Sequence, residues 1–157
     1  MTKDGVGLWE RVRWGERIAA VAVVLLAVGL ALPAYVRSGK DLGAFETFGP
    51  TVFFLLLAAV FGVAVVLTAA RERSSAVPIA TVVWATWAAF AAVVCAAVRL
   101  AERPDGATGL GVGTYLQLAG AILLLVGCWQ GMRDERTDIY RPLEIEQRPP
   151  PKPRPGS

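Results

Sequence analysis

The sequence predicts an all-α fold, a transmembrane four-helix bundle. Hydrophobic residues make up 55% of the 157 residues, and the 16 basic and 13 acidic residues are confined to the two ends and three short gaps. The four uncharged stretches between them are residues 18–36, 50–70, 76–98 and 108–132. A helix needs about 20 apolar residues to cross the hydrocarbon core of a bilayer. We therefore expect one transmembrane domain over residues 18–132, with helices at about 18–36, 50–70, 76–98 and 109–131.

The first uncharged stretch has an alternative interpretation, that of a cleaved leader. A leader combines a short basic head, about 7 to 15 apolar residues and a small-residue cleavage site, and residues 29–31 fit such a site. Here the head is long, mixes acidic with basic residues and contains Trp9 and Trp14. Tryptophan rings are enriched at the membrane–water interface. The sequence therefore favours a retained first helix, preceded by an interfacial cytoplasmic segment over residues 1–17.

The distribution of Lys and Arg predicts the orientation. Twelve of these residues precede the first stretch, separate the second from the third, or follow the fourth. The other two gaps contain four: Arg37, Lys40, Arg99 and Arg103. Because short cytoplasmic loops carry the excess of basic residues, both termini are expected in the cytoplasm. The net charge of +3 then reflects the basic residues that orient the protein in the membrane, and no nucleic acid partner is expected.

The excess of Arg over Lys is typical of a GC-rich bacterial genome, which indicates a bacterial plasma membrane.

Proline and aromatic residues mark the expected ends of the helices. Pro50 suits the start of the second helix, where its missing N–H costs nothing, and Pro33 falls in the last turn of the first. In the gap between these helices, Phe45 and Phe48 are expected to dip into the outer interface.

The residue types at membrane depth argue against catalysis. The sequence contains no His, so neither an imidazole base nor a His-containing metal site is available. Cys95 and Cys128 are expected near opposite faces of the membrane, beyond disulfide reach, and we interpret them as small buried hydrophobes. No uncharged stretch contains an ionisable group of the kind that transporters and proton relays use. We predict no enzymatic activity, no cofactor and no metal.

A glycine stripe runs along the fourth helix. Its members are Gly109, Gly113, Gly120, Gly127 and Gly131, at spacings of four, seven, seven and four. Residues at these spacings share one helix face, and small residues let helix backbones approach closely in lipid. Two interpretations remain open: a seam within the chain against the first or third helix, or a seam with a second copy or another membrane protein.

The third helix and Gln117 supply further candidates. Ala88, Ala92 and Ala96 form a small-residue packing ridge, whereas Trp84 and Trp87 are expected to fill volume inside the bundle. The alternative is that the two indoles line a groove for a lipid or quinone. Gln117, the most polar residue at depth, is expected to form a hydrogen bond with a neighbouring helix, with a substrate contact as the alternative.

Residues 133–157 change character. A charged segment is followed by a basic, proline-rich one, which lacks the apolar mass to fold and is typical of an extended, disordered chain. We interpret this region as a flexible cytoplasmic tail, either a spacer or a docking segment.

Four segments carry a resemblance. RWGERIAAVAVVLL, LALPAYV, VPIATVVW and GTYLQLAGAILLLVGCWQGMRDER resemble the small, uncharacterised four-helix integral membrane proteins of high-GC Gram-positive bacteria. The resemblance implies the bundle and no activity. We therefore expect a non-enzymatic accessory subunit or scaffold that acts through helix packing and its tail. Its partners would be membrane lipids and a second copy or another membrane protein. The alternative is a carrier or binder of lipid or another small hydrophobic molecule.

Overall fold

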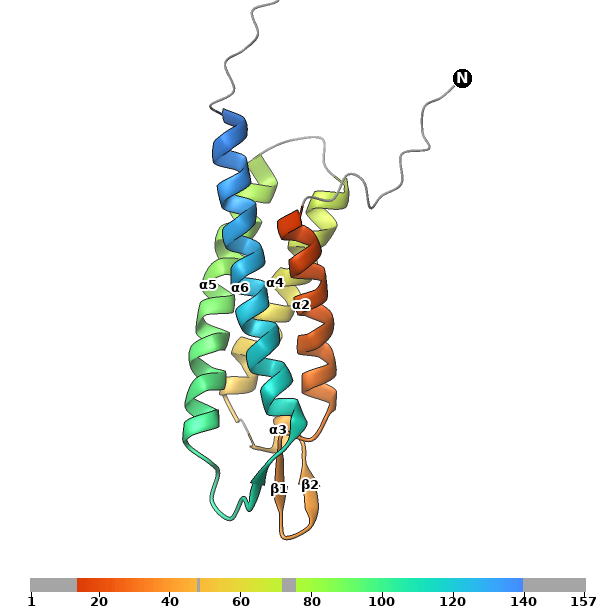
Figure 1. Ribbon diagram of the computed structural model, residues 1–157, viewed down its shortest axis with the longest axis vertical. Coiled ribbons are helices and arrows are strands. Elements are labelled where there is room, and N and C mark those ends of the chain that lie inside the picture. The colour runs from red at the N-terminus through yellow and green to blue at the C-terminus, as the bar shows by residue number, and fades with distance from the viewer. Residues whose placement is uncertain (1–13, 48, 72–75, 140–157) are drawn as a thin grey trace, which may run out of the picture.

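The computed structural model describes residues 14–47, 49–71 and 76–139. Four long helices dominate it: α2 (Trp14–Ala31), α4 (Thr51–Arg71), α5 (Ala76–Ala101) and α6 (Val112–Ile139). Each is long and apolar enough to cross a membrane. Their directions alternate, so that the start of α2 and the end of α6 lie at one end of the bundle (Figure 1). The predicted helical fold with four membrane-length helices is confirmed.

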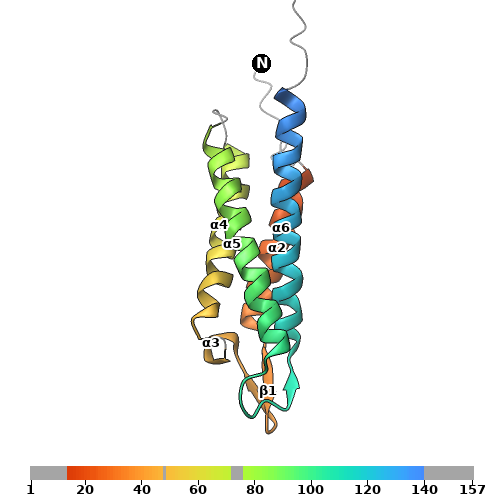
Figure 2. The same ribbon diagram turned by 90° about the vertical axis from the view of Figure 1, so that its left-hand side faces the viewer.

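The helices pack in the ring order α2, α4, α5, α6. Figure 2 shows α4 and α5 as one pair and α2 and α6 as the other. The core between them combines a few large residues with many alanines. Leu26, Leu55 and Leu124 are fully buried, as are Ala89 and Ala92 of α5. Alanine keeps the helices close, so that dispersion contacts along their full length hold the bundle together.

A small antiparallel sheet closes the end of the bundle opposite the two described chain ends (Figure 1). Its strands are β1 (Tyr35–Arg37), β2 (Lys40–Leu42) and β3 (Gly109–Leu110), in the order β2-β1-β3. Ser38 and Gly39 join β1 to β2 with φ angles of 49° and 79°, the positive values that a two-residue hairpin turn favours. A short helix, α3 (Ala44–Thr47), follows. The sequence did not predict this sheet.

The first helix departs most from its predicted bounds. It begins at Trp14, four residues earlier than expected, and ends at Ala31 instead of residue 36. Pro33 has no N–H to donate and disfavours helical geometry at the residue before it, so the chain leaves the helix and forms β1. The prediction that Pro33 lies within the helix is wrong.

The fourth helix is longer than predicted and begins later. It starts at Val112, so Gly109 lies in β3, and it continues to Ile139. The prediction of disorder from residue 133 is therefore wrong for residues 133–139, where Arg and Glu are good helix formers. The remainder of the predicted tail, residues 140–157, lies outside the described residues, as do Trp9 and Phe48. The second and third helices differ from their predicted bounds by one and three residues.

Candidate functional site

The contact between α2 and α6, which we call the glycine seam, follows a seven-residue repeat. On α6 the repeat places small or buried residues at 113, 117, 120, 124 and 127, and on α2 it places Gly15, Ala19, Ala22, Leu26 and Gly29 at the matching spacing. A repeat of four and three residues keeps one stripe of each helix against its partner.

Three glycines of α6 lie in backbone contact with α2. A Cβ built on Gly120 would lie 2.9 Å from Leu26 Cγ and 3.1 Å from the carbonyl oxygen of Ala22. A Cβ on Gly127 would lie 2.8 Å from the carbonyl oxygen of Gly15, and one on Gly113 would lie 2.8 Å from that of Gly29. Only glycine fits these positions. The interpretation of Gly113, Gly120 and Gly127 as a seam within the chain, against the first helix, is confirmed.

Two members of the predicted stripe do not take part in this way. Gly109 lies in β3, and a Cβ at Gly109 or at Gly131 would meet no atom within 4 Å. The sequence interpretation also missed the partner glycines Gly15 and Gly29, where an added Cβ would clash with the backbone of α6. Gly15 and Ala19 are four residues apart, the spacing of small residues that lets two helices approach closely. This pattern was the available signal in the sequence.

Gln117 lies fully buried in the glycine seam. Its Nε2 donates a hydrogen bond of 2.8 Å to the carbonyl oxygen of Gly29, so the predicted contact with a neighbouring helix is confirmed. Its Oε1 is buried and meets no donor among the described residues. An amide that satisfies only one of its two ends stabilises the seam less than a fully paired one.

Hydrogen bonds extend the glycine seam into the sheet. Thr114 Oγ1 donates to the carbonyl oxygen of Ala34 at 2.6 Å, and the backbone N–H of Gly111 donates to the same oxygen at 2.7 Å. Next to them, the hydroxyl of the fully buried Tyr35 donates to the carbonyl oxygen of Arg99 at the end of α5. Burial raises the pKa of Tyr35, and the nearby positive charges of Arg99 and Arg103 lower it by less.

The alanine ridge of α5 packs as predicted. Ala88, Ala92 and Ala96 are buried, together with Ala85 and Ala89 on the same side of the helix. They face the neighbouring helices α4 and α6.

Trp84 and Trp87 do not fill the interior. Their side chains are 62% and 66% exposed, so the volume-filling prediction is wrong. The alanines of the inner stripe occupy the core, and the two indoles lie on the outer surface of α5. Trp84 stacks against Phe61 of α4, with ring centroids 6.5 Å apart and an interplanar angle of 15°. Trp87 lies toward α6 instead.

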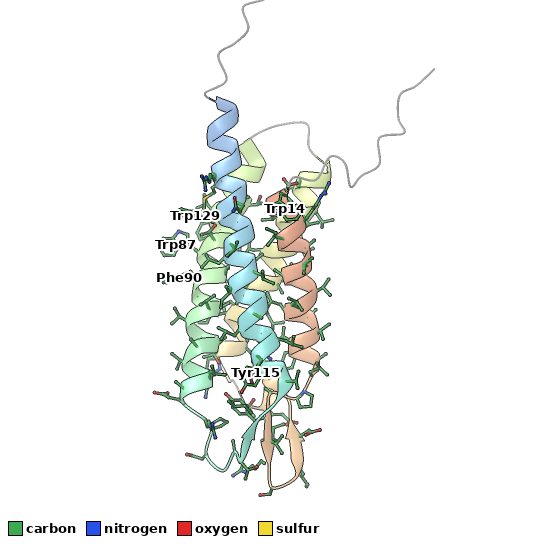
Figure 3. The ribbon with its side chains drawn as sticks, in the orientation of Figure 1. Trp14, Trp87, Phe90, Tyr115 and Trp129 are labelled. Atoms are coloured by element: carbon green, nitrogen blue, oxygen red, sulfur yellow. The ribbon has the colours of Figure 1, made fainter. Side chains whose placement is uncertain are left out.

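A groove opens between α5 and α6, and we call it the α5–α6 groove. Its volume is about 600 Å³, and its lining consists of Thr86, Trp87, Phe90, Leu125, Val126 and Trp129. Figure 3 shows Trp87, Phe90 and Trp129 along this side of the bundle, and each is more than half exposed. The one hydroxyl in the lining, that of Thr86, donates to Val82 of its own helix at 2.7 Å. The lining therefore offers apolar surface and two indole N–H donors.

Aromatic side chains also mark two levels along the bundle. Trp14 and Trp129 lie toward the end where the described chain begins and ends, and Tyr115 lies toward the sheet (Figure 3). Tyr115 and Trp129 are separated by about 21 Å along α6, at 1.5 Å per residue.

The described residues show no metal-binding or disulfide chemistry. In residues 14–47, 49–71 and 76–139, no three His, Cys, Asp or Glu side chains come together as a metal site. Cys95 and Cys128 are free thiols; Cys128 is buried, and Cys95 is half-buried.

Comparisons with protein-family models, with curated proteins and with solved structures found no match to this chain.

Proposed function

We propose that the chain is a four-pass integral protein of a bacterial plasma membrane with both termini in the cytoplasm. Four apolar helices of membrane length support insertion. Large apolar side chains such as Val24, Val60 and Phe90 are exposed along their outer faces, which costs free energy in water and none in lipid. The basic bias of the sequence supports the orientation.

Single-cysteine labelling tests the orientation. In a background without Cys95 and Cys128, Ser38→Cys in the β1–β2 turn should react with an impermeant maleimide added outside intact cells. Ser75→Cys should react only after the membrane is opened. The opposite pattern would invert the proposed topology.

Within that membrane, we propose a non-enzymatic accessory subunit or scaffold that binds an apolar helix of a partner protein in the α5–α6 groove. The groove itself is the observation that supports this role. The glycine seam is occupied within the chain, so it leaves no face for a partner. Trp87 and Trp129 flank the groove and are exposed, and tryptophan is the residue type most enriched at the energetic centres of interfaces.

A lipid or another small hydrophobic molecule is the second candidate occupant. The observation that favours it is the pair of indoles: in the part of the chain that the structure describes, neither Trp87 nor Trp129 donates its N–H to a protein acceptor. An exposed indole N–H that faces lipid has no water molecule to accept its hydrogen bond, and tryptophan favours sites where its apolar ring and its polar N–H are both accommodated. The ester carbonyl of a lipid would supply the acceptor.

Native mass spectrometry of the mildly solubilised protein separates the two candidates. A partner adds the mass of a protein, and a carrier adds the mass of a lipid or small molecule. Trp87→Ala should reduce either adduct at least fivefold, because it removes one wall of the groove. Trp84→Ala is the matched control: it removes an equally exposed indole from the same helix outside the groove. If the two variants behave alike, the groove is not the binding surface.

A further inference from the structure

A second, smaller groove lies on the other side of α6, toward α2 and at the level of Trp14. It has a volume of about 280 Å³ and lies between α2 and α6. Its lining consists of Trp14, Arg17, Ile18 and Val21 from α2 and Leu123 from α6. We call it the Arg17 groove. Unlike the α5–α6 groove, it contains a charged group.

The lining of the Arg17 groove is graded along the bundle. Residues 14, 17, 18 and 21 fall on one face of α2 because they are three or four apart. Trp14 and Arg17 are exposed near the start of the helix, and Val21 follows about 6 Å deeper, at 1.5 Å per residue. The groove is therefore aromatic and cationic at its mouth and aliphatic at its base.

Leu123 completes the base from the other helix. Gly127 lies beside Gly15 and Ala19, and Gly120 lies beside Leu26, so the residue midway between these glycines is level with the middle of α2. This position brings Leu123 opposite Val21. Two helices thus form an apolar channel below a single guanidinium.

This gradient matches one class of ligand. We infer that the Arg17 groove binds an anionic phospholipid, with the phosphate at Arg17, the Trp14 indole beside the headgroup and an acyl chain along Ile18, Val21 and Leu123. A guanidinium forms charge-assisted hydrogen bonds with phosphate oxygens, and a long Arg side chain reaches the headgroup layer from a helix end. A free anion would meet only the guanidinium, whereas a phospholipid also covers the apolar base.

The electrostatics favour the headgroup over competing charges. Arg17 already takes part in an interaction within the chain, but a guanidinium has five N–H donors and can bind a phosphate oxygen in addition. An anionic lipid at a membrane surface gains about 1 kcal/mol from each nearby Arg or Lys, which is about a fivefold preference at 25 °C. This inference rests on the proposed membrane insertion and is independent of the α5–α6 groove.

Lipid titration of the delipidated, detergent-solubilised full chain tests it. Native mass spectrometry with phosphatidylglycerol and phosphatidylcholine of identical acyl chains should show about fivefold tighter binding of phosphatidylglycerol. Arg17→Gln should abolish that preference by weakening phosphatidylglycerol more than phosphatidylcholine, because both carry a phosphate but only phosphatidylglycerol has a net negative charge. Arg17→Lys should keep most of the preference. Val21→Ser should weaken both lipids.

Arg133→Gln is the matched control. Arg133 is also exposed, and it lies near the same end of the bundle but does not line the groove. Equal losses in Arg17→Gln and Arg133→Gln would show diffuse charge attraction and overturn the site. Displacement of phosphatidylglycerol by inorganic phosphate at constant ionic strength would show a small-anion site and overturn the lipid assignment. Unchanged melting temperatures establish that both variants are folded, and the labelling of Ser38→Cys tests insertion separately.

Discussion

The two sides of α6 differ in how closely they meet their neighbours. Toward α2, Gly113, Gly120 and Gly127 lie in backbone contact and leave no space for a Cβ. Toward α5, Leu125 and Trp129 leave a groove of about 600 Å³. In lipid, apolar surface gains nothing from leaving water, so association depends on close contact. The comparison teaches that the glycine face of α6 is used up in packing against α2, whereas its aromatic face keeps an open apolar groove.

The comparison extends to the sheet end of the bundle. The glycine seam continues into hydrogen bonds to Ala34, whereas α5 is attached there through Tyr35 and Arg99. We therefore expect substitutions in the seam to change stability and substitutions in the α5–α6 groove to change binding.

Gly120→Leu should have the largest effect. Its side chain would meet backbone atoms of α2, with Leu26 N 3.0 Å and Ala22 O 3.1 Å from the first added carbon, and these atoms cannot rotate away. We expect a loss of about 3 kcal/mol, at the upper end of overpacking costs, measured as a lower melting temperature of the isolated chain in detergent. Leu118→Ile, at a half-buried neighbouring position, should be tolerated. An unchanged melting temperature for Gly120→Leu would contradict the seam.

Thr114→Val should have the next largest effect. It keeps the shape of the side chain but removes the buried 2.6 Å hydrogen bond to Ala34, and we expect a loss of about 1.5 kcal/mol in the free energy of unfolding. Thr86→Val is the matched control. Thr86 donates to Val82 of its own helix at the edge of the groove, and its other side-chain contact is with the Cys128 thiol of α6. A thiol is a weak hydrogen-bonding group, so the loss should be smaller than for Thr114, under about 1 kcal/mol. Equal losses would remove the energetic contrast between the two sides of α6.

Some of the fold could be predicted because a helix of membrane length needs about 20 consecutive apolar residues. Four uncharged stretches were enough to place four helices, and the spacing of Gly113, Gly120 and Gly127 was enough to place them on one face. The sheet could not be predicted, since strands of two or three residues contain too few positions for an alternating pattern. The end of α2 could not be predicted from the apolar run, since that run continues beyond Pro33 although the helix ends before it.

The candidate grooves were harder to predict. In a soluble helix, the apolar side faces the core, but α5 is apolar on its buried side and on its exposed side. The sequence alone therefore did not show that the alanines face inward and that Trp84 and Trp87 face outward. The Arg17 groove depends on Leu123, which lies 106 residues after Arg17 in the sequence and joins it only through the packing of α6 against α2.

Tyr35→Phe should have a smaller effect, and that effect depends on pH. At pH 8 it removes one hydrogen bond to Arg99, with a cost of about 1 kcal/mol. Because the pKa of Tyr35 is raised in the folded state from the ordinary value of 10.0, the contribution of this group to stability is fully present below that value. It is lost as the pH rises above it, where the unfolded chain loses its proton first. Tyr35→Phe should flatten that part of the alkaline loss. Parallel melting curves for both proteins from pH 8 to pH 11 would contradict the burial of this hydroxyl.

Gly131→Ala should have the smallest effect and the opposite sign. Gly131 belongs to the same sequence stripe as Gly127, but an added Cβ meets no atom within 4 Å. Alanine in an open helical position reduces the conformational entropy of the unfolded chain, which stabilises the fold by about 0.5 kcal/mol. The same substitution at Gly127 places its Cβ 2.8 Å from the carbonyl oxygen of Gly15 and should destabilise the fold. Melting temperatures that move in opposite directions would show that backbone contact, and not the sequence spacing of glycines, defines the seam; a shared direction would show that the spacing alone was sufficient.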